Sequence, residues 1–140
     1  MWCCKCHRET DAMLVGGMTI NTKRPECWNQ KFYQCPICLN YCNARKIGDE
    51  WKPIAFIATP ALRAERQRLH ELFDPVWKND PLPGISRKGW YDYMTFGMNQ
   101  GPDYRFHFGF LRSFRECKRA EKLIKRIYKK KGLIFPKQSV

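Results

Sequence analysis

Residues 1–6 read Met-Trp-Cys-Cys-Lys-Cys, and residues 33–38 read Tyr-Gln-Cys-Pro-Ile-Cys. Each segment contains two cysteines separated by two residues, a spacing that lets both thiolates face one metal ion from a tight turn. Two such turns supply the four sulfur ligands that zinc takes in a closed tetrahedral site. The sequence therefore predicts a zinc ribbon over residues 1–50, and the four ligands of its single zinc ion are Cys3, Cys6, Cys35 and Cys38.

Three other cysteines in this region leave alternatives to that ligand set. Cys42 follows Cys38 by four residues and could replace it, and Cys4 and His7 repeat the two-residue spacing. A second zinc site would draw on Cys4, Cys27, Cys42 and His7. The simpler interpretation is that the three thiols are spare and that His7 is a surface residue or hydrogen-bonds to a ligand. Four thiolates leave no open coordination position, so the predicted zinc is structural.

The length and composition of the chain favour zinc over disulfide bonds. A ribbon of about 45 residues buries too little apolar surface to fold without a bound metal ion or disulfide bonds. The 140-residue chain contains eight cysteines, which could supply either. The first residues lack the apolar segment of a signal peptide, and no run reaches the roughly 18 apolar residues of a membrane span. We therefore expect a cytoplasmic protein without a membrane partner, in which thiols stay reduced or bind metal.

Short apolar runs predict the strands of the ribbon. The pair Gly16-Gly17 lies between two such runs and predicts a hairpin turn. Residues 28–33 predict a strand that leads into the second cysteine pair. Residues 43–50 are polar and predict a connector. Within this connector, which extends to residue 59, residues 51–58 are apolar and predict either an edge strand or an extended segment packed on the following helix. The proline in this segment argues against a central strand.

The second part of the chain, residues 51–132, predicts three helices. Thr59-Pro60 is a typical helix start, with a capping hydroxyl followed by proline at the first helical position. Pro75 is expected to kink or divide this first helix, because proline has no N–H to donate. After a predicted loop at residues 79–85, Ser86 can cap the second helix.

The remaining segments complete the predicted fold. Residues 104–110 alternate aromatic and other side chains, which predicts a strand or an extended segment. Residues 111–130 predict a third helix with one apolar and one basic face, and residues 133–140 predict a loose tail. The predicted fold class is α+β: an N-terminal four-cysteine zinc ribbon packed on a small three-helix module that ends in a long basic amphipathic helix.

The positive charge of the chain is concentrated near its C-terminus. The net charge is +13, and residues 111–131 contain ten basic and two acidic residues. Six of these basic side chains recur every three or four residues and form one stripe: Arg112, Arg115, Arg119, Lys122, Arg126 and Lys129. A second candidate binding face, on the first helix, consists of Arg63, Arg66 and His70. This charge asymmetry indicates a polyanionic partner, with nucleic acid as the first candidate.

The order of these motifs resembles a family of small, mostly phage-borne proteins described as zinc-finger-containing and of unknown function. The most specific part of the resemblance is the helix motif Arg63-x-x-Arg66-x-x-x-His70-x-x-Phe73-Asp74-x-x-Trp77. The other matching features, within residues 3–120, are the two cysteine pairs, an apolar segment ending at Ala58, Arg87 followed by Tyr93-Met94, and His107-Phe-Gly109 followed by Cys117. The long span between the cysteine pairs and the prominent basic helix depart from the family pattern. The resemblance implies zinc, a two-part architecture and a phage or prophage origin in a bacterial host, and it implies no reaction.

We predict a protein that binds nucleic acid, DNA or RNA, or regulates transcription, and that has no catalytic residues. The second interpretation is a host-directed factor that inhibits a bacterial polymerase, nuclease or defence complex, as an anti-CRISPR does. The third is a metal-dependent nuclease built on His70, Asp74, Asp103 and His107, and the absence of a recognised catalytic motif argues against it. Membrane binding by the last helix is a minor alternative, because its apolar face is needed for the core of the helical module. The form of the nucleic acid and the oligomeric state stay open.

Overall fold

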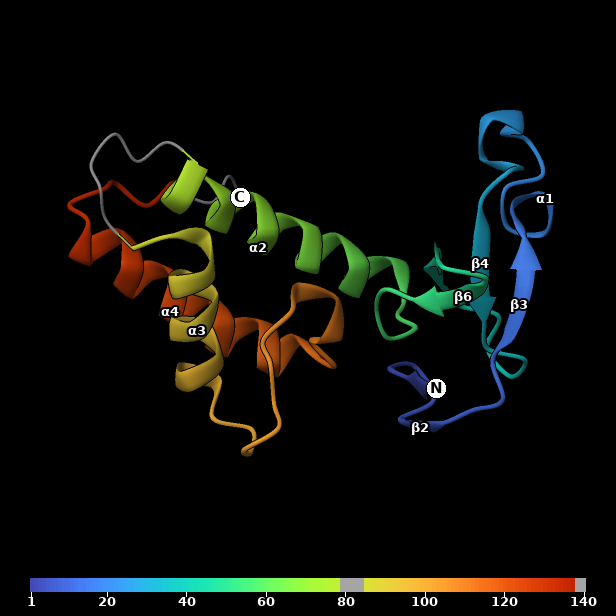
Figure 1. Ribbon diagram of the computed structural model, residues 1–140, viewed down its shortest axis with the longest axis horizontal. Helices are drawn as coiled ribbons and strands as arrows, with labels where there is room; N and C mark the ends of the chain where they lie inside the picture. The colour runs from blue at the N-terminus through green and yellow to red at the C-terminus, as the bar shows by residue number, and fades with distance from the viewer. Residues whose placement is uncertain (79–84, 138–140) are drawn as a thin grey trace. The chain divides into compact units, whose positions relative to one another are not determined.

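The computed structural model describes residues 1–78 and 85–137. Contacts within the chain separate two compact units, Met1–Ala64 and Glu65–Val140, which we call unit 1 and unit 2. Unit 1 contains the strands, and unit 2 contains most of the helical residues, so the predicted α+β class is confirmed (Figure 1). No helix in the described part of the chain is both long and apolar enough to cross a membrane.

Unit 1 contains two antiparallel sheets. One is the two-stranded sheet β1-β2, and the other has four strands in the order β3-β4-β5-β6. The elements of this unit are β1 (Trp2–Cys3), β2 (Arg8–Glu9), β3 (Met13–Gly16), α1 (Gly17–Ile20), the 3-10 turn η1 (Pro25–Cys27), β4 (Lys31–Gln34), β5 (Tyr41–Ile47) and β6 (Glu50–Pro53). Cys3 also forms a parallel bridge with Ile57, which joins the small sheet to the segment that precedes the first long helix.

The predicted hairpin at Gly16-Gly17 is wrong. β3 ends at Gly16, and Gly17 begins the short helix α1 instead of a returning strand. The partner of β3 is β4, which follows after a loop and pairs Phe32 with Val15. A Cβ atom at Gly17 would lie 1.7 Å from the carbonyl oxygen of Cys27. The glycine is therefore needed for a close approach of two backbone segments rather than for a turn.

A β-hairpin occupies the predicted polar connector at residues 43–50. β5 and β6 pair from Ala44 with Pro53 to Ile47 with Glu50. The strand predicted after residue 50 is the edge strand β6, as expected, and an edge position tolerates its proline. This pairing keeps residues 50–53 in unit 1. The connector prediction failed because Asn43, Arg45 and Lys46 of β5 are exposed and polar, so the strand carries no regular apolar alternation.

Unit 2 is built from three helices and one apolar core. α2 (Pro60–Lys78) begins in unit 1 and continues into unit 2, where α3 (Arg87–Met98), the 3-10 turn η2 (Phe108–Phe110) and α4 (Phe114–Lys130) follow. Side chains from each helix are fully buried, among them Leu69, Phe73, Val76, Met94, Met98, Ile124 and Ile127. Each helix therefore contributes one apolar face to a shared core, as the periodicity of the sequence predicts.

Side-chain caps fix where the helices begin. The hydroxyls of Thr59, Ser86 and Ser113 each accept a hydrogen bond from the backbone N–H three residues later. The backbone N–H groups in the first turn of a helix have no acceptor within the helix, and these hydroxyl oxygens supply one. The starts predicted at Thr59 and Ser86 are thus confirmed, whereas the third helix begins at Phe114 and not at Leu111.

Pro75 does not divide α2, which is helical to Lys78. The last turns of this helix are supported by side chains near the end of α4. Tyr128 donates its hydroxyl to the carbonyl oxygen of Leu72 over 2.6 Å, and the Lys131 ammonium donates to the carbonyl oxygen of Val76. Tertiary hydrogen bonds and the burial of Val76 therefore outweigh the cost of proline within the helix.

The aromatic segment at residues 104–110 is not a strand. Phe106 and Phe108 are both buried, and their ring centroids lie 4.8 Å apart. Phe108 also packs edge-on against Phe73. The two-residue alternation reflects core contacts of an irregular segment that has no partner strand among residues 85–137 of unit 2.

Two sequence predictions reach residues that the structure does not describe. The predicted loop at residues 79–85 lies outside the described residues except for Ile85, and the predicted tail is described as far as Lys137. Within the tail, the ring of Phe135 packs edge-on against Tyr128 at 5.2 Å between centroids. The first part of the tail therefore contacts α4.

Candidate metal centre and nucleic-acid interface

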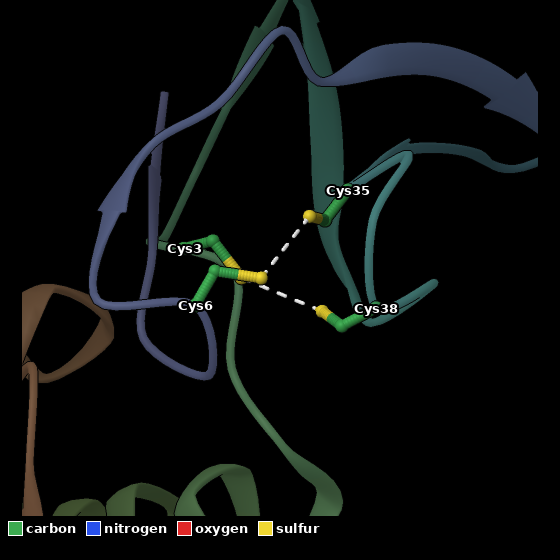
Figure 2. Close-up of side chains that lie close together, drawn as sticks. All are labelled: Cys3, Cys6, Cys35 and Cys38. Atoms are coloured by element: carbon green, nitrogen blue, oxygen red, sulfur yellow. Dashed lines mark hydrogen bonds between the residues drawn. The ribbon is translucent and has the colours of Figure 1, made fainter.

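Four cysteine sulfur atoms converge in unit 1, as Figure 2 shows. The Sγ atoms of Cys3, Cys6, Cys35 and Cys38 all lie within 4.8 Å of one another. Cys3 and Cys38 are separated by 3.5 Å between sulfurs, and Cys6 and Cys35 by 3.8 Å. A tetrahedral zinc ion with Zn–S bonds of about 2.3 Å needs sulfurs about 3.8 Å apart. The four side chains therefore fit one zinc ion, and they are the four predicted from spacing.

The two cysteine pairs adopt the same turn. The N–H of the residue after the second cysteine donates to the carbonyl of the first, from His7 to Cys3 over 2.9 Å and from Leu39 to Cys35 over 3.0 Å. His7 and Leu39 have φ angles of +56° and +62°, in the left-handed region. This turn directs both thiols of a pair to the same side. Leu39 and His7 are exposed, so the left-handed backbone conformation at these two residues does not bring their side chains into conflict with the core.

The surroundings of the sulfur atoms shift the pKa values of two of the cysteine thiols. Burial would raise the pKa of the Cys35 thiol, but the N–H groups of Cys38 and Ile37 lower its pKa to about 6. Burial, followed by hydrogen bonding to Cys35, raises the pKa of Cys6 to about 12. The protein alone therefore stabilises one thiolate, that of Cys35. A bound dication is required to keep all four cysteines ionised. Zinc binding is consequently expected to release protons and to weaken as the pH falls.

Sequence analysis missed one neighbour of the metal site. The side-chain amide of Asn40 donates to the sulfur of Cys38 over 3.3 Å. An N–H donor to a zinc thiolate neutralises part of its charge and orients it. The only signal in the sequence is a polar residue two positions after the second cysteine pair, which is too common to interpret by itself.

The remaining cysteines of unit 1 do not join the metal site. Cys42 is buried with its thiol 3.8 Å from the sulfur of Met1, Cys4 is buried, and Cys27 lies in η1. No second group of three or more ligand-type side chains gathers within residues 1–78 and 85–137. These thiols therefore pack as small apolar groups, and His7 is exposed at the turn after Cys6.

Comparison with known families places this site in context. The chain matches a domain family of unknown function described as a zinc-finger-containing domain, over residues 1–127. Because this match covers most of its length, the chain belongs to that family of zinc-finger-containing domains. No curated protein and no solved structure matches the chain significantly. The family and the four converging cysteines together define a zinc-binding protein with one structural zinc site.

The exposed side of α4 carries the predicted cationic stripe, which we call the basic face. α4 contains eight basic and two acidic residues, and its buried positions all lie on the opposite side. The basic face consists of five exposed side chains of α4 and one that precedes the helix: Arg115, Arg119, Lys122, Arg126 and Lys129, with Arg112 before the N-cap. Of these, Arg115, Lys122, Arg126 and Lys129 form no ion pair among the described residues.

Both acidic residues of α4 are occupied by other partners. Glu116 accepts hydrogen bonds from the side chain of Gln100 and from the backbone N–H of Arg112. Glu121 lies 3.0 Å from the guanidinium of Arg68 on α2. Neither carboxylate forms an ion pair with Arg115, Lys122, Arg126 or Lys129 among the described residues, so the charge of these four side chains is uncompensated there.

The three residues of the second candidate face each have a contact within their own unit. Arg63, in unit 1, donates to the carbonyl oxygen of Tyr41 over 2.8 Å and lies over its ring. His70, in unit 2, stacks on Phe108 with 4.8 Å between ring centroids, and its Nε2 lies 3.3 Å from Asp74. Arg66 is only 6% exposed. We therefore assign structural contacts to this face, which leaves α4 as the main candidate for binding.

Three of the four residues considered for a nuclease, His70, Asp74 and His107, are likewise engaged in local structure. His107 accepts a hydrogen bond from the N–H of Gly109 at its Nδ1 atom, as the cap of η2. Asp74 bridges His70 and Lys78 on α2. These side chains form no ligand cluster with each other in the described part of the chain. The arrangement thus offers no support for the nuclease interpretation.

Replacing Arg66 by methionine is expected to destabilise unit 2. The guanidinium donates through Nε over 2.9 Å and through Nη2 over 2.5 Å to the carbonyl oxygen of Leu111. A buried carbonyl left without a donor costs about 1–3 kcal/mol in the free energy of unfolding. Urea denaturation measures this loss, with Gln67→Met, an exposed neighbour on α2, as the control. An Arg66→Met variant that is as stable as the unmodified protein would contradict this structural role.

Proposed function

We propose that this zinc-binding protein binds nucleic acid through the basic face of α4, while zinc keeps unit 1 folded. The observation that carries the proposal is the row of exposed cations opposite the buried side of α4. Four of them, Arg115, Lys122, Arg126 and Lys129, form no ion pair among the described residues. Such a row attracts polyanions and gains affinity by releasing the counterions that phosphates hold. The closed shell of four thiolates has no open position for substrate, so the zinc is not part of the binding surface.

The dimensions of the helix suit a phosphate backbone. From Arg115 to Lys129 the basic face extends over about 21 Å, at about 1.5 Å per residue. One strand of duplex DNA carries a phosphate about every 3.4 Å along its axis, so this length corresponds to about six phosphates. Contacts to phosphates position a protein but do not read bases. We therefore expect binding that depends strongly on charge and weakly on sequence.

The dependence of affinity on salt tests this proposal with the unmodified protein. Neutralising about six phosphates predicts a slope of log Kd against log salt near 5 in magnitude for a duplex and near 4 for a single strand. Fluorescence anisotropy with labelled oligonucleotides over a series of salt concentrations measures both slopes. Absence of binding at low salt would contradict the proposal. Nuclease-resistant capture of one bacterial protein, together with that absence, would favour the host-directed interpretation.

A further inference from the structure

A cavity of about 710 Å³ opens on the surface of unit 2 along α3, from Lys88 near the start of the helix to Asn99 at its C-terminal end. Its lining includes Phe96, Asn99, Tyr104, Lys88 and Arg105. α3 ends because Asn99 adopts a left-handed conformation, and the following turn carries the chain back so that Tyr104 lines the same cavity as Phe96. The volume lies within the range of about 300–1,000 Å³ that ligand pockets occupy.

Phe96 is the unusual residue of this cavity. Its side chain is 86% exposed, whereas Trp90, Met94 and Met98 on the same helix are buried. The aromatic ring is therefore not part of the core of unit 2. A fully exposed phenylalanine that lines a concave surface offers a flat apolar face on which another ring can stack.

The polar groups around Phe96 match a nucleotide better than an apolar ligand. Lys88 and Arg105 supply two cations, and the exposed amide of Asn99 can both donate and accept hydrogen bonds. Lys88 pairs with Asp92 at 3.1 Å, but Lys88 is 86% exposed in that pair. Asp92 also lines the cavity, but an exposed ion pair of this kind is weak, so a phosphate can displace it from Lys88.

Contacts within unit 2 connect the end of α3 to the basic face. Arg119 donates through Nη2 to the carbonyl oxygen of Met98 over 2.6 Å, and the side chain of Gln100 donates to Glu116 over 3.0 Å. Met98 and Gln100 immediately flank Asn99, which lines the cavity. A strand that follows the phosphate-binding side of α4 can therefore reach the cavity at the N-terminal half of that helix.

We propose that this cavity takes one unpaired base of a single-stranded nucleic acid, stacked on Phe96, with its phosphate held by Lys88 and Arg105. The inference deepens the proposed function, on which it rests, because it selects single strands over duplexes. In a duplex the bases are already stacked on their neighbours and present no free face to Phe96. Stacking on an aromatic side chain accepts any base, so the site confers a preference for single strands without a preference for sequence.

Binding of matched oligonucleotides to Phe96 variants tests the inference. The probes are fluorescein-labelled oligothymidine and oligouridine of about twelve nucleotides, within the usual range of site sizes, a duplex of equal length, and an abasic oligonucleotide with the same phosphates. Phe96→Ala is expected to weaken oligothymidine binding about 5- to 150-fold. The affinities for the duplex and for the abasic probe should stay unchanged. Phe96→Trp, which keeps an aromatic face, should restore the affinity, and the oligouridine arm distinguishes RNA from DNA.

The control is Ile134→Ala, which removes a 92% exposed apolar side chain of unit 2 that does not line the cavity. Phe96 is too exposed for its loss to unfold the protein. Equal oligothymidine affinity for Phe96→Ala and the unmodified protein would overturn the inference and leave the proposed function intact. An equal loss for the abasic probe would overturn it too, because the effect would not involve a base. Failure of every probe to bind would overturn both proposals.

Discussion

Removal of the zinc ion is expected to unfold unit 1. In zinc-finger peptides, structural zinc contributes roughly 10–16 kcal/mol to the folded state near neutral pH, which exceeds the total stability of most small domains. The dependence is direct here because two ligands, Cys3 and Cys35, are also fully buried members of the core of unit 1, together with Cys42 and Ile57. Loss of the ion therefore leaves several thiols clustered without a partner and removes the centre of the core.

Cys35→Ser and a chelator are the two ways to test this expectation. Serine keeps the size of the side chain but is a poor zinc ligand, so the zinc content should fall from one per chain to near zero. Amide resonances of residues 1–64 should lose their dispersion at the same time. Native mass spectrometry and NMR measure these two quantities.

Cys27→Ser provides the matched control for the ligand substitution. Cys27 lies in unit 1 but outside the four-sulfur cluster, so this variant should retain its zinc. A Cys35→Ser variant that still holds one zinc ion with a folded unit 1 would contradict the assignment of the site.

Reversing three charges on the basic face is expected to abolish nucleic-acid binding at physiological salt. Arg115, Lys122 and Arg126 are exposed and form no ion pair among the described residues. Each phosphate contact contributes about 0.9 to the magnitude of the salt slope for a duplex, so losing three contacts should lower that magnitude by about 3. The three glutamates also repel the backbone, which adds to the loss of affinity.

The fold should tolerate this triple substitution, because exposed substitutions change stability by about 0.5 kcal/mol or less each. We leave Arg119 unchanged because its hydrogen bond to Met98 supports the packing of α3 and α4. Circular dichroism checks that α4 is intact.

The control variant reverses Lys23, Arg45 and Lys46, which are exposed residues of unit 1. This control produces the same change in net charge at another surface. If both triple variants lose affinity equally, binding depends on total charge rather than on the basic face. If neither loses affinity, the basic face is only a solvated surface and the proposed function is wrong.

Features that depend on residues close together in the sequence were predicted correctly more often than features that depend on distant residues. The zinc ligands were predictable because the turn of each pair closes within five residues, from Cys3 to His7 and from Cys35 to Leu39. The hairpin at Gly16-Gly17 was predicted wrongly because the strand that pairs with β3 lies beyond a loop. Local turn propensity does not reveal such a partner.

The sequence by itself determined the four-cysteine zinc site, the starts of α2 and α3 and the amphipathic character of α4. Each of these depends on residues a few positions apart, whose geometry is set by one turn or one helical period. Only the tertiary structure decided that Arg66 is buried against Leu111, that α2 continues through Pro75, and that Phe96 lines a cavity beside Tyr104. Those outcomes depend on which distant segments meet in unit 2, because burial and hydrogen-bond partners are properties of the packed chain and not of a local pattern.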